Sequence, residues 1–195
     1  MTHPTRPVPI VIKAPEEIAR MRRAGELAAR ALDAVLSAVE PGATTATLDR
    51  LAETFIRDHG GVPSFKNYRG FPASICVSVD EEVVHGIPGR RRLRAGDIVS
   101  LDLGVFLDGF HGDVARTVTI GEVDAQSRRL LRVAEEALLV GIREAREGRT
   151  TGDLGHAIQR VVEAEGFSVV RDFAGHGIGR DLHEGPEVPN YGTPG

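Results

Sequence analysis

The sequence predicts an α+β protein in which a unit of two helices, a strand and a β-hairpin is duplicated. Three observations support this prediction: apolar residues recur at helical spacing, β-rich segments flank an Asp108-Gly109 turn, and a Gly-x-Thr-Thr loop recurs later in the chain. The chain has 195 residues, 41% of them hydrophobic and 27% charged. A chain of this length can bury a core without a disulfide or a metal. We expect one domain over 10–195 and a flexible tail over 1–9.

Four segments are expected to be helical. In 16–39, Ile18, Leu27 and Leu32 belong to an apolar series at helical spacing, Pro15 suits the first turn, and Pro41-Gly42 ends the helix. The others are 47–59, stopped by Gly60-Gly61, then 125–147 and 153–165.

Four segments are expected to be strands. Residues 74–79 alternate and are β-rich, and 98–107 and 110–120 form a hairpin around Asp108-Gly109. A short strand is expected over 167–170. Residues 62–73 are loop-like, and no element is assigned to the Gly-, His- and Pro-rich remainder.

An internal repeat relates the two helix pairs. Matching residues stand 106 positions apart: Gly42 and Gly148, Thr44 and Thr150, Thr45 and Thr151, Leu48 and Leu154, Gly60 and Gly166. Common residues could coincide by chance, but a gap-free offset across the loop and both helices favours duplication. The hairpin should then recur over 204–226, beyond residue 195, so we expect the second unit to be incomplete.

Charge and cysteine content limit the function classes. The net charge of −4 argues against a nucleic-acid-binding surface as the main function. The basic run of Arg90, Arg91, Arg92 and Arg94 is interpreted as a solvated loop, with contact to RNA or another polyanion less favoured. A single cysteine excludes an internal disulfide framework and favours a reducing compartment. With no membrane-length apolar run and no signal-peptide pattern, we expect a cytoplasmic protein.

Two aspartates in the hairpin are candidate metal ligands. A two-residue turn at Asp108-Gly109 places Asp102 opposite Ala115, with Asp113 two residues along on the same face. Two bare carboxylates about 4 Å apart repel by about 4 kcal/mol at an effective dielectric near 20, a cost that a cation would reverse. The alternative is that these aspartates cap loops or pair with Arg116 or Arg94.

Histidines strengthen the metal interpretation. The segment 175–184 holds His176 and His183 among alternating glycines, and His85 stands in the rigid turn His-Gly-Ile-Pro. Imidazole together with carboxylate suits zinc, iron, cobalt or manganese. Taken singly, each histidine is more simply a surface or core residue. His111 falls on the carboxylate face by parity and is a candidate supporting residue. Cys76 is expected to be a buried apolar residue rather than a nucleophile.

The motifs together resemble type I methionine aminopeptidase. They are Phe-Pro-Ala-Ser-Ile-Cys-Val-Ser at 71–78, His-Gly-Ile-Pro at 85–88, Asp-Gly-Phe-His-Gly-Asp at 108–113 and Gly-His-Gly-Ile-Gly-Arg at 175–180. The resemblance runs in order from about 10 to 191. It implies the pita-bread fold, a curved antiparallel sheet covered by helices with pseudo-twofold symmetry, in agreement with the offset of 106.

The resemblance also implies a site. That site holds two divalent metal ions through two aspartates, one histidine and two glutamates. Asp102, Asp113 and His176 match the first three ligands, whereas the first glutamate would fall at 208 by the repeat; Glu184 and Glu187 match no ligand position. His85 and His183 match the histidines that contact the substrate and stabilise the intermediate. By position, the methionine pocket is lined by Phe65, Tyr68, Phe71, Cys76 and Leu182; some members carry a second cysteine where Phe65 stands.

The implied reaction is release of the N-terminal methionine from peptides and nascent chains. The metals would be cobalt, manganese, iron or zinc, and the protein a cytoplasmic monomer, close to the ribosome, with no membrane or specific nucleic-acid partner. Because two ligands and the general base are expected outside this chain, we expect residues 1–195 to be inactive alone. The alternatives are a proline dipeptidase, suggested by Asp102-Leu103-Gly104, and a non-catalytic peptide-binding member. An aspartic acid/base dyad explains neither histidine segment.

Overall fold

The computed structural model describes residues 10–195, so the predicted tail over 1–9 lies outside the described residues. The chain forms two compact units. The first-repeat unit comprises 13–124 and 178–182, and the second-repeat unit comprises 10–12, 125–177 and 183–195. None of the described helices is long and apolar enough to cross a membrane.

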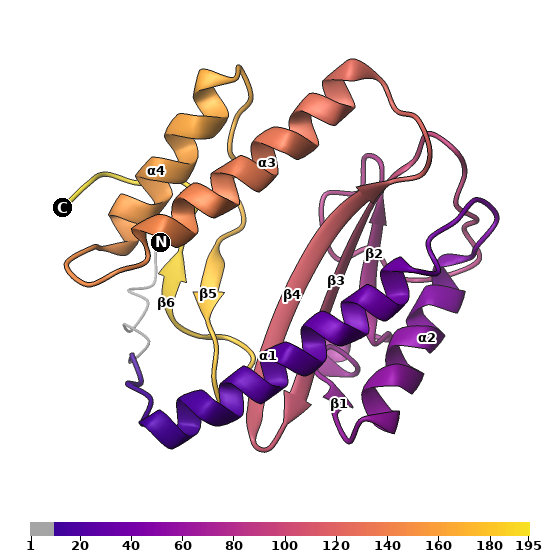
Figure 1. Cartoon of the computed structure of the whole chain (residues 1–195), viewed down its shortest axis with the longest axis horizontal. Helices are drawn as coiled ribbons and strands as arrows, with labels where there is room; N and C mark the ends of the chain where they lie inside the picture. The colour runs from indigo at the N-terminus through magenta and orange to yellow at the C-terminus, as the bar shows by residue number, and fades with distance from the viewer. Residues whose placement is uncertain (1–9) are drawn as a thin grey trace, which may run out of the picture. The chain divides into compact units, whose positions relative to one another are not determined.

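The first-repeat unit combines two α-helices with a four-stranded antiparallel sheet (Figure 1). Its elements are α1 (Pro15–Leu36), α2 (Thr45–Asp58), β1 (Val62–Pro63), the 3-10 turn η1 (Tyr68–Gly70), β2 (Ile75–Val79), β3 (Ile98–Leu107) and β4 (Phe110–Thr119). Strand β3 pairs with β4 along its whole length and with both β1 and β2. Because β1 contacts 105–106 and β2 contacts 99–103, these two strands follow one another along the same edge of β3.

The hairpin between β3 and β4 follows its sequence signal closely. Asp108 has φ of 52° and Gly109 has φ of 84°, the two left-handed residues that a type I′ turn requires. Arg23 of α1 donates through Nε and Nη2 to Asp108 Oδ2 at 3.0 and 2.8 Å. The turn therefore fixes the register that the alternation of side chains predicted.

The core lies between the two helices and one face of the sheet. Its fully buried residues include Leu27, Ala28, Leu32 and Val35 of α1, Leu48 and Ile56 of α2, and Leu101, Leu103 and Val105 of β3. Helix α1 approaches β4 so closely that a Cβ on Gly112 would lie 2.6 Å from the carbonyl carbon of Ala24. With this face packed against helices, the opposite face of β3 and β4 is left to the polar side chains.

The second-repeat unit contains two helices and a short β-ladder. Its elements are α3 (Ala125–Glu144), α4 (Thr151–Ala164), β5 (Gly175–Gly177) and β6 (Glu184–Val188), the two strands being antiparallel. The chain after β6 passes against α4 at two glycines, since Cβ atoms on Gly152 and Gly155 would lie 2.3 Å from the carbonyl oxygens of Thr193 and Tyr191.

The predicted repeat is present in the backbone. Helices α2 and α4 begin 106 residues apart and also end 106 residues apart. Thr44 and Thr150, the residues before them, each accept a backbone N–H at the third helical position. Gly42 and Gly148 both have positive φ, as do Gly60 and Gly166. The corners of the two helix pairs are therefore built in the same way.

The long helices of the two repeats differ in what covers them. Ala24 and Leu32 of α1 are 0% and 3% exposed, because they face the sheet. Their counterparts in α3, Leu130 and Leu138, are 46% and 60% exposed. In this chain α3 buries only the row that faces α4, formed by Val133, Ala137 and Gly141.

Parts of the secondary-structure prediction were wrong. Residues 62–73, expected to be a loop, contain the two-residue strand β1 and the 3-10 turn η1. Residues 167–170 form no strand: the Phe167 N–H donates to Val162 O at 3.2 Å, so this stretch continues from the end of α4. Strands β5 and β6 were not predicted, because glycine and proline interrupt the alternation over 175–188. The predicted helix over 125–147 ends at Glu144, ahead of a tight turn in which the Arg149 N–H donates to Arg146 O.

Candidate metal and substrate site

Asp102 and Asp113 lie on the same face of the hairpin, as predicted. Asp102 is directly opposite Ala115, and Asp113 is opposite Gly104, two residues along β3. A hydrogen bond joins the two carboxyl groups, and burial, the charge of Asp113 and this hydrogen bond raise the pKa of Asp102. Without a cation, the pair therefore retains a proton that an isolated aspartate would release.

Each of the two arginines considered as a partner for these aspartates has a contact elsewhere. Arg116 Nη1 lies 3.8 Å from Asp33 Oδ1, and Arg94 donates its backbone N–H to Asp97. A carboxyl pair, half-buried at Asp102 and exposed at Asp113, that holds a proton in place of a cation suits a divalent ion, which binds oxygen ligands and displaces the proton.

Cys76 lies beside this pair on β2. It is paired with Asp102 in the β2–β3 ladder and is 4% exposed. Burial, followed by the charges of Asp102 and Asp113, raises the pKa of its thiol to about 12. The expectation that Cys76 is buried is confirmed, and the raised pKa argues against a role as nucleophile.

Phe65 and Ser64 cover the sheet next to the carboxylates. A Cβ on Gly104 would lie 2.8 Å from Ser64 Cβ and 2.9 Å from Phe65 Cε1, so only glycine fits opposite Asp113. Ser64 Oγ is hydrogen-bonded to His111 Nδ1 at 2.8 Å. The prediction that His111 shares the carboxylate face is confirmed, whereas its partner Ser64, 47 residues away in the chain, gave no signal in the sequence.

The remaining pocket candidates of the first-repeat unit lie on a compact loop and at the end of the segment over 178–182. Tyr68 and Phe71 are half-buried, and the loop is closed by hydrogen bonds from Tyr68 N to Phe65 O and from Phe71 N to Tyr68 O, both 2.9 Å. Leu182 is 2% exposed. All five predicted pocket residues therefore belong to the unit that carries the aspartates.

His85 occupies a strained position next to β2. Its φ is 59°, and the following Gly86 donates to Ser78 Oγ and accepts from Val77 N. A Cβ on Gly86 would lie 2.2 Å from Val77 O. The His-Gly sequence is thus held against β2, the strand that also carries Cys76.

His176 and His183 form a pair in the second-repeat unit. Their ring centroids are 4.1 Å apart, and His176 Nδ1 lies 2.9 Å from Gly177 O. Glu187 is the ladder partner of His176, and a Cβ on Gly177 would lie 2.3 Å from Gly185 O. The glycines of this motif permit close approach of the two strands, as expected from their spacing.

The predicted site residues thus divide between the two units. Asp102, Asp113 and His85 belong to the first-repeat unit, and His176 and His183 to the second. Within residues 10–195, no three histidine, cysteine or acidic side chains lie together as a ready-made metal cluster. One unit therefore supplies the carboxylates of Asp102 and Asp113, and the other supplies the paired rings of His176 and His183.

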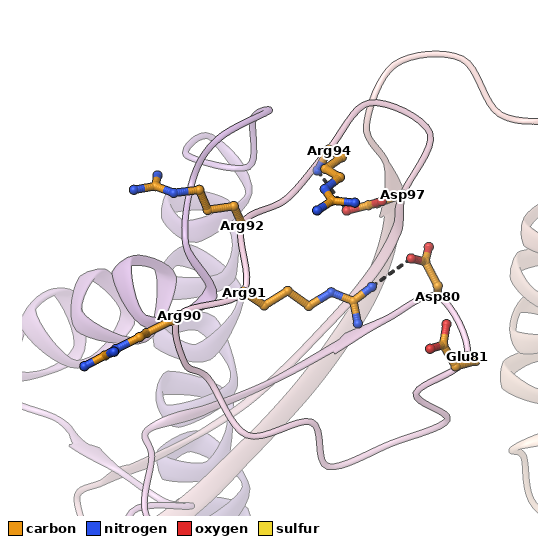
Figure 2. Close-up of a pocket in the computed structure, with 7 residues that line it drawn as sticks. All are labelled: Asp80, Glu81, Arg90, Arg91, Arg92, Arg94 and Asp97. Carbon is orange, nitrogen blue, oxygen red and sulfur yellow. Dashed lines mark hydrogen bonds and ion pairs between the residues drawn. The ribbon is translucent and has the colours of Figure 1, made fainter.

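A separate cavity of about 610 Å³ lies beside the basic run and is lined by charged side chains of both signs (Figure 2). Its lining consists of Asp80, Glu81, Asp97 and the four arginines of the run. Arg91 donates to Asp80 at 2.9 Å, while Figure 2 shows Arg90 and Arg92 pointing away from the acidic residues. The ion pair with Asp80 offsets the charge of Arg91, and the interpretation of the run as a solvated loop stays a prediction.

Comparison with known proteins matches residues 19–195 to metallopeptidase family M24. A methionine aminopeptidase from Clostridium acetobutylicum is 51% identical over 187 residues, covering 95% of this chain and 75% of the relative. The crystal structure of methionine aminopeptidase from Rickettsia prowazekii superposes with a TM-score of 0.93 at 44% identity, covering 95% of this chain and 75% of that one.

A prolidase from Pyrococcus furiosus shares the fold, with a TM-score of 0.80 at 22% identity, over 93% of this chain and 53% of the prolidase. The predicted pita-bread α+β fold and the resemblance to a metallo-aminopeptidase are confirmed, and the family implies divalent metal ions. The chain belongs to metallopeptidase family M24, among its methionine aminopeptidases.

Proposed function

We propose that this chain releases the N-terminal methionine from peptides and nascent chains, using two divalent metal ions held by Asp102, Asp113 and His176 together with further ligands. The observation that carries this proposal is the hydrogen-bonded carboxyl pair of Asp102 and Asp113, beside the buried Cys76 and the ring of Phe65. Residues 10–195 are proposed to act as one catalytic domain.

The donor set indicates the kind of metal. Carboxylate with imidazole suits manganese, iron, cobalt or zinc. When bound, such ions supply a water of lowered pKa and polarise a carbonyl group. Asp102 and Asp113 must lose their shared proton before they can bind, so we expect affinity for the metal to rise with pH.

The proposed specificity comes from an apolar pocket. Phe65, Tyr68, Phe71, Cys76 and Leu182 would line it. A neutral thiol and aromatic rings suit a flexible thioether, because methionine fills irregular apolar space and contacts aromatic rings favourably. His85 and His183 are proposed to hold the peptide by hydrogen bonds and to stabilise charge that develops on it.

The proposed partners and cellular location follow from the resemblance to methionine aminopeptidase. The partners are peptides with N-terminal methionine, including nascent chains near the ribosome, and the protein works as a cytoplasmic monomer without a membrane or specific nucleic-acid partner. Asp102, Asp113 and His176 supply three of the five ligands that the resemblance implies. We therefore propose that turnover by residues 1–195 alone is low, and that a non-catalytic peptide-binding role is the second candidate.

A direct assay separates these functions. The protein is incubated with Met-Ala-Ser and, separately, Ala-Pro, in the presence of Mn²⁺ or Co²⁺. Release of methionine that EDTA abolishes and Asp102→Asn removes supports the proposal, with Asp33→Asn as the control, since Asp33 is a solvent-exposed aspartate. Preference for Ala-Pro would move the chain to the dipeptidases. Binding of Met-Ala-Ser without cleavage would favour the peptide-binding role.

A further inference from the structure

We propose that His111 is a positioning residue that holds both walls of the substrate pocket against the strand that carries Asp113. Its imidazole ties down the loop over 64–71, and its backbone ties down the segment over 178–182. This inference rests on the proposed function, because it assigns a role within the same pocket.

The imidazole contact is specific. His111 Nδ1 lies 2.8 Å from Ser64 Oγ, and Ser64 is only 9% exposed. The His111 ring also packs on Phe106, its ladder partner, with centroids 4.7 Å apart. The hydrogen bond to Ser64 and the packing on Phe106 together fix the orientation of the imidazole ring. A positioning residue needs such support for its own side chain.

Ser64 transmits this contact to the pocket. Its Cβ and the Phe65 ring lie directly over Gly104, the residue opposite Asp113. Three successive pairs on this face are Phe106 with His111, Gly104 with Asp113, and Asp102 with Ala115. The loop is thus anchored at the Phe106–His111 pair, next to the pair that contains Asp113. Its first aromatic residue, Phe65, packs on Gly104 of that second pair.

The backbone of His111 holds the second wall. Its N–H donates to Gly179 O at 2.8 Å. The same segment is held by Arg180, which stacks over Phe110 at 4.7 Å and pairs with Glu17 at 2.9 Å. The segment ends at the buried Leu182, so the position of this pocket residue depends on attachment to β4.

These attachments matter because neither wall has a regular structure of its own. The loop contains only the three-residue turn η1, with Asn67 and Arg69 at positive φ, and 178–182 contains no helix or strand. Loops of this kind are mobile unless side chains fix them. Loss of the His111 contact should therefore impair substrate binding more than the chemical step.

The test compares His111→Leu with His111→Asn and Ser64→Ala. Asparagine can present a polar atom where Nδ1 stands, whereas leucine cannot. His59→Leu is the matched control, because His59 Nδ1 lies 2.8 Å from Phe55 O and its ring stacks on Phe55 at 4.2 Å, at the end of α2. Km and kcat are measured on Met-Ala-Ser with Mn²⁺, and the rate of Cys76 alkylation by iodoacetamide is measured without metal.

We expect His111→Leu and Ser64→Ala each to raise Km about fivefold to tenfold, the usual net effect of one hydrogen bond, with kcat changed less than about threefold. The double variant should be no worse than either single one, and His111→Asn should restore most of the loss. Cys76 alkylation should accelerate in His111→Leu but not in His59→Leu at equal thermal stability. A fall in kcat with unchanged Km would overturn the proposal, as would equal effects of His111→Leu and His59→Leu.

The two proposals can fail separately. If the wild-type chain does not cleave Met-Ala-Ser at all, the low turnover proposed for residues 1–195 is rejected in favour of the peptide-binding role, while alkylation of Cys76 still reports whether His111 fixes the pocket walls. If His111→Leu does not fold, Ser64→Ala and His111→Asn carry the comparison. The wild-type chain could cleave Met-Ala-Ser while Ser64→Ala changes neither Km nor the rate of Cys76 alkylation. That result would reject the positioning role and leave the proposed function intact.

Discussion

Cys76 lies directly opposite Asp102 in the β2–β3 ladder, so the one thiol of the chain is next to a carboxyl group whose pKa is raised to about 7. Burial first, and then the charges of Asp102 and Asp113, raise the pKa of the thiol and make it a poor nucleophile. The relationship also makes Cys76 a chemical reporter for the ionisation of the aspartates.

The first prediction concerns that thiol. Because its pKa is raised to about 12, Cys76 should be alkylated by iodoacetamide far more slowly than free cysteine at pH 8, and the rate should rise about tenfold per pH unit. Asp102→Asn removes one of the negative charges and should accelerate alkylation. The rate is followed by mass spectrometry, with glutathione as the reference thiol. A rate for Cys76 equal to that of glutathione would contradict the assignment.

The second prediction concerns pH and stability. The pKa of Asp102 is raised from 3.8 to about 7, so between these values the folded chain binds more protons than the unfolded chain. The free energy of unfolding should therefore fall as pH rises from about 4 to about 7, by about 2–4 kcal/mol. Asp102→Asn should flatten this dependence, which thermal unfolding across pH would show.

Metal should reverse this loss. Because protons compete with cations for the two carboxylates, Mn²⁺ should raise the melting temperature more at pH 8 than at pH 5.5. The exposed Asp33→Asn variant should respond like the wild type. An equal metal effect at both pH values, or one retained in Asp102→Asn, would show that the ion binds elsewhere.

The third prediction uses the repeat as its own control. Leu32 and Leu138 occupy equivalent positions, but Leu32 is 3% exposed and Leu138 is 60% exposed. Leu32→Ala should lower the free energy of unfolding by about 2–5 kcal/mol, whereas Leu138→Ala should change it by less than about 0.5 kcal/mol. Urea titrations of both variants give the comparison. Similar losses would mean that α3 is covered in solution.

The fourth prediction compares two glycines. A Cβ on Gly104 would lie within 3 Å of Ser64 and Phe65, whereas nothing lies within 4 Å of a Cβ on Gly25 in α1. Gly104→Ala should destabilise the protein by about 1–3 kcal/mol and displace the Phe65 ring. Gly25→Ala should stabilise it by about 0.5–1 kcal/mol, since alanine favours the helix. Thermal unfolding measures both, and a stabilising Gly104→Ala would show that the loop does not rest on the sheet.

The hairpin and the carboxyl pair were predictable from local sequence. Asp108-Gly109 dictates a two-residue turn, and alternation on either side then fixes Asp102 opposite Ala115. The error at 167–170 arose because apolar residues alone do not make a strand: Phe167 instead lies under the Arg129 guanidinium at 5.2 Å and continues from α4. A strand needs a partner, which no local pattern can supply.

Long-range contacts were beyond sequence reasoning for the same reason. The resemblance identified Asp113 and Phe65 as site residues, but it gave no indication that Ser64 would join His111 across 47 residues. Strands β5 and β6 could not be predicted, because the glycines over 175–188 interrupt the alternation of polar and apolar side chains. These glycines instead allow the two strands to approach closely.

The equal length of helices α2 and α4 has a consequence for which mutations this chain tolerates. Inserting one residue into a helix turns every later side chain by about 100° around its axis, which would move Ile56 or its counterpart away from its neighbours. A substitution leaves the direction of every later side chain unchanged, and Thr47 of α2 corresponds to Asp153 of α4. We therefore expect variation among relatives of this chain to replace the exposed residues between Thr44 and Gly60 more readily than the buried Leu48 and Ile56, while the number of residues there stays constant.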